Sequence, residues 1–195
     1  QAQWSTFVNY MTNYCSNPAG MAVNGTNAGL CVYANALAWK IAPGTYGTAY
    51  ADKACSLLKF AVDWNDGNTG GLLDTTAKID NGDTFRWTGP PLARAYDILR
   101  DHCEALDPTV GVTFRDYALR LWNYYKPTSL GGTKQFLMLT SAYQAGTNIG
   151  VGQVNSVVQT AIAAYDPIAF TTPQSWLSTI MTSVMTPLVM TCLQN

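Results

Sequence analysis

Apolar side chains recur every three or four residues along most of this chain. That interval places them on one face of an α-helix, and it is the main secondary-structure signal in a sequence. The pattern is clearest where Leu92 is followed by Tyr96, Leu99, Cys103 and Leu106. We find no pair of alternating runs joined by the tight turn of a β-hairpin. The periodicity therefore predicts an all-α fold.

Prolines and glycines divide this pattern into about eight helices. Pro43, Pro127 and Gly146 each follow a periodic segment, as expected at helix ends, and Thr172 is an expected N-cap. The expected helices cover residues 3–14, 28–41, 48–64, 90–106, 113–125, 133–144, 152–165 and 173 onward. Because short connections make consecutive helices antiparallel neighbours, we expect an array of four helical hairpins. A chain of 195 residues can bury one sizeable core, so residues 1–195 are predicted to form a single α-helical domain.

One long connection is expected, at residues 65–85, and it is rich in glycine and aspartate. Structureless loops of this length are uncommon and are often functional. Arg86 and Trp87 stand at its end. Pro90 and Pro91 then fit the first turn of a helix, because the amides there have no intrahelical partner in any case. This places Arg86 and Trp87 just before a helix begins.

The composition excludes two classes of function. Charged residues make up 12% of the chain and the net charge is −1, without a basic cluster that could neutralise phosphates. Nucleic-acid binding is therefore not expected. Because no run reaches the roughly 18 apolar residues of a transmembrane helix, no membrane span is expected either. Such low charge suits extracellular proteins and subunits that bury much of their surface in an assembly.

The five cysteines do not match a metal or redox motif, since no two lie within four residues of each other. Cys55 and Cys103 lie on the apolar faces of neighbouring predicted helices. If the chain is oxidised, we expect Cys55 to pair with Cys103 and Cys15 with Cys31, which leaves Cys192 over. The alternative is a reduced protein in which Cys55, Cys103 and Cys192 are small buried hydrophobic residues.

Other features favour a secreted, extracellular protein. Asn24-Gly25-Thr26 is a sequon for N-glycosylation, so Asn24 is the predicted glycosylation site. Gln1 at the first position fits a mature N-terminus left by signal cleavage, although a trimmed chain would look the same. Together with the cysteines and the low charge, these features indicate an oxidising compartment.

Several segments resemble the (α/α) toroid polysaccharide lyases, the alginate-lyase and heparinase-like families. Residues 36–64, ALAWKIAPGTYGTAYADKACSLLKFAVDW, resemble one helix of that layout. An arm with glycines follows, then the Arg86-Trp87 pair and the Ala-x-Ala-Tyr-Asp of residues 93–97. Residues 119–122, Leu-Arg-Leu-Trp, resemble the next helix. The resemblance covers residues 28–146 and implies an array like part of such a toroid.

The same resemblance implies β-elimination on uronate-containing glycans. Such chemistry needs a group that neutralises the carboxylate and a base that removes the neighbouring proton. Tyr124 or Tyr125 would be the base and Arg86 the neutraliser. The Asn-His pair that these families carry at the start of the following helix is missing, because residues 128–133 read Thr-Ser-Leu-Gly-Gly-Thr. A non-catalytic relative is therefore the first reading, and a lyase or a fragment of one is the alternative.

Aromatic residues at predicted helix ends and loops suggest how glycans would bind. Sugar rings stack on aromatic faces, and an arginine can hold a carboxylate through two hydrogen bonds. The candidate glycan-binding residues are Trp64, Arg86, Trp87, Trp122 and Tyr125. The alternative for Trp122 and Tyr125 is that they fill gaps in the core, as large aromatic residues normally do.

Two further candidates have simpler explanations. Asp63, Asp66 and Asp74 could supply oxygen ligands to Ca²⁺, but the spacing of an EF-hand is absent and aspartates in loops usually form turns. We therefore expect no cofactor, with calcium as the alternative. His102, the single histidine, could be a general base. The alternative is a surface residue that interacts with the helix dipole.

These observations lead to two functional hypotheses. The first is an extracellular, non-catalytic helical module that binds carbohydrate, self-assembles as a structural homo-oligomer or filament, or does both. The second is a polysaccharide lyase.

Overall fold

The computed structural model describes residues 25–62, 82–132 and 148–186, together with Gln3, Ser5–Phe7, Asn9 and Cys15. Within these ranges the side chains of residues 25–28, 46, 82–87 and 148–149 are outside the description. The predicted helix at residues 133–144, and most of the one at 3–14, lie outside the described residues. Among the described residues the fold is all-α, as predicted, and the nearest approach to a strand is one bridge between Asp166 and Phe170.

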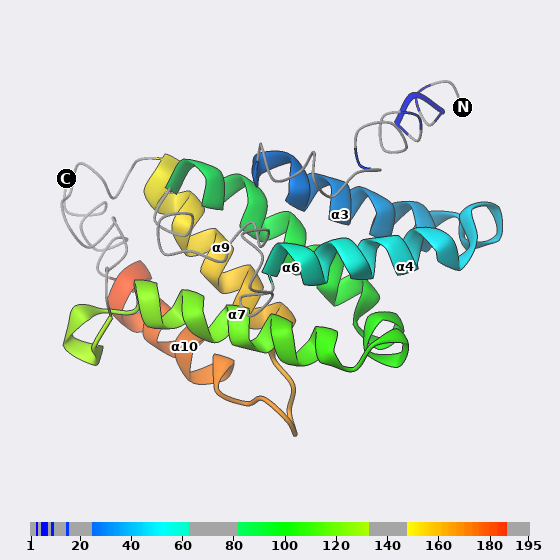
Figure 1. The fold of residues 1–195 in the computed structure, drawn as a ribbon. Coiled ribbons are helices and arrows are strands. Elements are labelled where there is room, and N and C mark those ends of the chain that lie inside the picture. Colours follow the sequence, from blue (N-terminus) through cyan, green and yellow to red (C-terminus); the bar gives the residue numbers. More distant parts are fainter. Residues whose placement is uncertain are drawn as a thin grey trace.

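Six α-helices make up most of the described chain (Figure 1). They are α3 (Gly25–Ile41), α4 (Pro43–Val62), α6 (Gly82–Leu106), α7 (Thr109–Tyr125), α9 (Asn148–Ala164) and α10 (Pro173–Ile180). A short 3-10 helix, η1 (Thr128–Leu130), follows α7, and a π-helical turn, η3 (Met181–Met185), extends α10.

The helices form three antiparallel hairpins, α3–α4, α6–α7 and α9–α10. Figure 1 shows that α3, α6 and α9 run in one direction, while α4, α7 and α10 return. The central helix is α6, which packs against α3 on one side and α9 on the other. The predicted array of helical hairpins is confirmed for this part of the chain.

Helix α4 is interrupted near its start by Gly47, whose φ is 59° and ψ −170°. Glycine adopts positive φ without the steric cost that a side chain would add. The helix predicted from residue 48 is the continuous part of α4 after this interruption. Its apolar face, with Ala54, Leu58 and Ala61 fully buried, packs into the core.

The predicted start of the fourth helix was wrong. Helix α6 begins at Gly82, so Pro90 and Pro91 lie inside it and not in its first turn. Without amide hydrogens, the prolines cannot bond to the carbonyl groups four residues earlier, which is why they were read as a helix start. Packing against α3 outweighs this local preference: a Cβ on Gly29 would lie 2.5 Å from the Thr88 carbonyl oxygen, so the two backbones are almost in contact.

The start of α7 and the cap of α10 also differ from the prediction. Helix α7 begins at Thr109 and not at residue 113, because the Asp107 carboxylate accepts hydrogen bonds from the Thr109 amide (2.9 Å) and hydroxyl (2.7 Å). Thr172 precedes α10 as predicted but is not a side-chain cap. Its own backbone is helical, and its carbonyl oxygen accepts a hydrogen bond from the Ser175 hydroxyl.

Both predicted disulfides are present. Cys55 of α4 bonds to Cys103 of α6, and Cys15 bonds to Cys31 of α3. All four residues are buried in the same core as Tyr96, Phe114 and Tyr125. Cys192 lies outside the described residues. None of the helices searched, which are those of the described residues, has the length and apolar character needed to cross a membrane.

Candidate binding groove

Three contacts join successive turns of α4 to the end of α6 and to Asp107, the residue that follows α6, and we call this line the α4–α6 seam. Asp52 Oδ1 lies 2.7 Å from His102 Nε2, Cys55 is bonded to Cys103, and Lys59 Nζ lies 2.9 Å from Asp107 Oδ2. The α4 partners are three and four residues apart, which places them on one face of that helix. The seam therefore fixes one face of α4 against the C-terminal half of α6.

A groove opens beside the Cys55–Cys103 disulfide, between α4 and the turn that joins α6 to α7. It has a volume of about 340 Å³ and is lined by Cys55, Ser56, Lys59, Phe60, Leu106, Asp107 and Val110. This volume is within the range of small-molecule sites, which usually combine an apolar wall with a few polar groups. Here Phe60, Leu106 and Val110 supply the apolar wall, while Ser56, Lys59 and Asp107 supply the polar groups.

Asp107 is the anchor of the polar side of the groove. One carboxylate oxygen accepts the two hydrogen bonds from Thr109, and the other accepts the bond from Lys59. The hydrogen bonds from Lys59 and then from Thr109 lower the pKa of Asp107 from 3.8 to about 2. The carboxylate is therefore ionised at any physiological pH and holds the Lys59 ammonium at the edge of the groove.

His102 is placed by tertiary contacts. Its side chain is 24% exposed, pairs with Asp52, and lies against Trp39 of α3 with 5.4 Å between the ring centroids. His102 is therefore half-buried, and not the solvated surface residue that the sequence alternative describes. His102 joins α3, α4 and α6, and it is not among the residues that line the groove.

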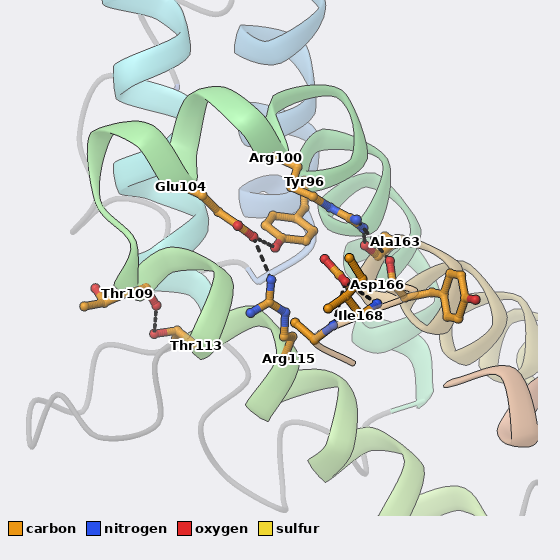
Figure 2. A network of polar contacts seen from close by, with 11 residues as sticks. Tyr96, Arg100, Glu104, Thr109, Thr113, Arg115, Ala163, Asp166 and Ile168 are labelled. Atoms are coloured by element: carbon orange, nitrogen blue, oxygen red, sulfur yellow. Dashed lines mark hydrogen bonds and ion pairs between the residues drawn. The ribbon is translucent and has the colours of Figure 1, made fainter. Parts of the chain in front are cut away.

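A second polar network lies on the other side of α6, between α7 and α9 (Figure 2). The Tyr96 hydroxyl donates to Glu104 Oε1 at 2.5 Å, and Arg115 of α7 reaches the same oxygen at 3.2 Å. Arg100 donates to the carbonyl oxygens of Ala163 and Tyr165, at the end of α9. Burial, and then the hydrogen bond to Glu104, raise the pKa of Tyr96.

This network connects helices through buried and half-buried side chains. The Tyr96 ring is fully buried and stacks on Phe114 with 4.0 Å between centroids. Glu104 also fills the space above Gly111, where an added Cβ would lie 2.3 Å from its carboxylate oxygen. We therefore assign the network to the packing of α6 against α7 and α9.

The structure buries three of the aromatic residues predicted for the site. Tyr125 is fully buried, Trp122 and Tyr124 nearly so. Trp122 stacks on Trp176 of α10 at 5.5 Å between centroids, and the Tyr124 and Tyr125 rings meet edge to face at 5.0 Å. This placement matches the core-filling alternative for Trp122 and Tyr125.

The other predicted site residues fall outside what the structure describes. The backbone of Arg86 and Trp87 lies in the N-terminal part of α6, but their side chains are outside the description. Entirely outside it are Asn24, Asp63, Trp64, Asp66 and Asp74. Among the residues that are described, His, Cys, Asp and Glu do not gather in a group of three that could hold a metal ion.

The sequence analysis did not select the groove residues. Phe60 and Lys59 looked like ordinary members of an amphipathic helix, because their partners on α6 and α7 are more than 45 positions away. Asp107-Pro108-Thr109 carried the usable signal, since an aspartate and a proline before a periodic segment mark a helix start. Asp107-Pro108-Thr109 therefore predicts the start of α7 and a fixed position for the Asp107 carboxylate.

Comparisons of the chain with protein-family models, with curated proteins and with solved structures found no match.

Proposed function

We propose that this protein is an extracellular, non-catalytic helical module that binds glycans in the groove between α4 and the α6–α7 turn. The observation that carries the proposal is the composition of that groove, in which a half-buried aromatic ring lies one residue from a lysine that is held by a fixed carboxylate. A sugar ring is complementary to these groups, because its C–H faces are apolar and hydroxyl groups surround its edge.

Each wall of the groove has a role in this proposal. Phe60, Leu106 and Val110 take the apolar face of a sugar ring, and Phe60 contributes most because aromatic rings offer the largest flat surface. Lys59 has two ammonium hydrogens left after bonding to Asp107, and these donate to sugar hydroxyl oxygens. Ser56 donates its hydroxyl hydrogen to the Asp52 carbonyl oxygen, which leaves its oxygen to accept one from the ligand.

The extracellular part of the proposal is supported by the two disulfides, which persist in oxidising compartments, and by the low content of charged residues. Self-assembly is the other role expected from the sequence. Sedimentation velocity of the native protein over a range of concentrations tests that role independently of glycan binding.

The glycan experiment uses a panel of neutral and acidic oligosaccharides with isothermal titration calorimetry. We expect binding in the millimolar to micromolar range, and we expect Phe60→Ala to weaken it about fivefold or more, since a lost aromatic contact costs about 1 kcal/mol or more. Val112→Ala is the matched control, because Val112 is an exposed apolar residue of α7 that does not line the groove. Equal affinity of wild type and Phe60→Ala would contradict the proposal.

The same incubations test the lyase alternative. Elimination on a uronate creates a C=C bond that absorbs in the ultraviolet, so absorbance is followed with alginate, heparin and pectin. We expect no increase from the purified protein. A steady increase that depends on protein concentration would overturn the non-catalytic reading.

A further inference from the structure

We infer that the groove selects an uncharged sugar over both acidic and amino sugars. This inference rests on the proposed function and adds the chemical class of the ligand. It follows from the charges that line the groove, where Lys59 is the single cation and Asp107 the single anion among the lining residues. Because the two are paired at 2.9 Å, the lining is neutral as a whole.

An acidic sugar would disturb this pair. Its carboxylate could gain a strong hydrogen bond only from Lys59, and to do so it would have to lie beside the Asp107 carboxylate or draw Lys59 away from it. Asp107 stays ionised under all ordinary conditions because of its three hydrogen bonds. The repulsion between two carboxylates then offsets the attraction to the ammonium group.

An amino sugar meets the opposite difficulty. Its ammonium group would need a carboxylate, but three acceptor positions of Asp107 are already occupied by Lys59 and Thr109. The Lys59 ammonium lies beside that carboxylate and would repel the ammonium group of the ligand. Neutral hydroxyl groups avoid both problems, since they can accept from Lys59 and donate to Ser56 without displacing either residue.

Pairs of oligosaccharides in which one charged group is replaced by its neutral derivative test the inference. Oligogalacturonates are compared with their methyl esters, and de-N-acetylated chito-oligosaccharides with their N-acetylated forms, beside a set of unmodified neutral oligosaccharides. We expect the uncharged member of each pair to bind about fivefold or more tightly than its charged counterpart. Tighter binding of the charged member of either pair would overturn the inference and leave the proposed function standing. Binding of no sugar in the set would overturn the proposed function itself.

The variant Asp107→Asn changes the selectivity in a defined direction. Asparagine keeps an acceptor oxygen for the Thr109 bonds, so α7 can still begin there, but Lys59 loses its counter-charge. We expect the affinity for oligogalacturonate to rise about fivefold, while the affinity for its methyl ester changes little. Asp116→Asn is the control, since it changes the net charge equally at an exposed position of α7 that does not line the groove. An equal rise in both variants would show a general charge effect, and no rise in Asp107→Asn would show that the ion pair does not set the selectivity; either result overturns the inference.

Discussion

Removing the Cys55–Cys103 disulfide should destabilise the protein more than removing the Cys15–Cys31 disulfide. The bonded cysteines are 48 residues apart in the first case and 16 in the second. A cross-link lowers the entropy of the unfolded chain by an amount that grows with the loop it closes. That relation gives about 4 kcal/mol for the longer loop and about 3 kcal/mol for the shorter one. The expected difference between the two double variants is therefore about 1 kcal/mol.

The assay is urea unfolding at pH 7 of Cys55→Ala/Cys103→Ala, Cys15→Ala/Cys31→Ala and wild type. Because all four cysteines are buried, each double variant loses a similar amount of packing, and the difference between the variants reports mainly the loop. For a chain of this size, 1 kcal/mol corresponds to about 2–4 °C in Tm, which calorimetry resolves. If the short-loop variant were the less stable, or if wild type were unaffected by reduction, the chain-entropy reasoning would be refuted.

Three further predictions concern the helix contacts, the groove and the core. Gly29→Ala should lower the free energy of unfolding by about 1–3 kcal/mol. The added Cβ would lie 2.5 Å from the Thr88 carbonyl oxygen and force α3 away from α6. Urea unfolding that showed no loss of stability would contradict this contact. Asp107 stabilises the folded state above its unfolded pKa of 3.8, and this contribution should be lost as the pH falls towards 2. The stability difference between wild type and Asp107→Asn should therefore be largest near pH 7 and vanish near pH 2, as measured by urea unfolding at a series of pH values; a difference that grows in acid would reverse the sign of the linkage. Trp122→Ala should lower the free energy of unfolding by about 3–5 kcal/mol, since the Trp122 ring is buried against Trp176. A loss below about 1 kcal/mol in thermal unfolding would make Trp122 a candidate glycan-binding residue again.

Local patterns predicted what depends on local chemistry. The apolar periodicity that begins at Leu92 defined the buried face of α6 as far as Cys103, whereas Leu106 is exposed. The same faces of α4 and α6 predicted the pairing of Cys55 with Cys103. Short connections predicted antiparallel hairpins because the chain has no room to cross over. These features follow from residue spacing, so a single sequence is sufficient to predict them.

Contacts between distant residues could not be predicted in this way. Gly29 of α3 lies against Thr88 of α6, two residues before Pro90, and no local rule contains that contact. For the same reason the sequence left both a binding surface and the core open for Trp122, whose stacking partner Trp176 lies in α10. The groove requires α4 and the α6–α7 turn together, so no local pattern identifies it as a site.

The most direct test of glycan binding in the groove is a titration followed by NMR. Backbone amide resonances of the wild-type protein are recorded while the tightest-binding oligosaccharide of the panel is added. We predict that the largest shifts fall on residues 55–60 and 106–110, which contain the groove lining, and that Phe60→Ala needs about fivefold or more ligand to reach the same shifts. Largest shifts at Arg86 and Trp87, with residues 55–60 unchanged, would instead support the site predicted from the sequence and contradict the groove.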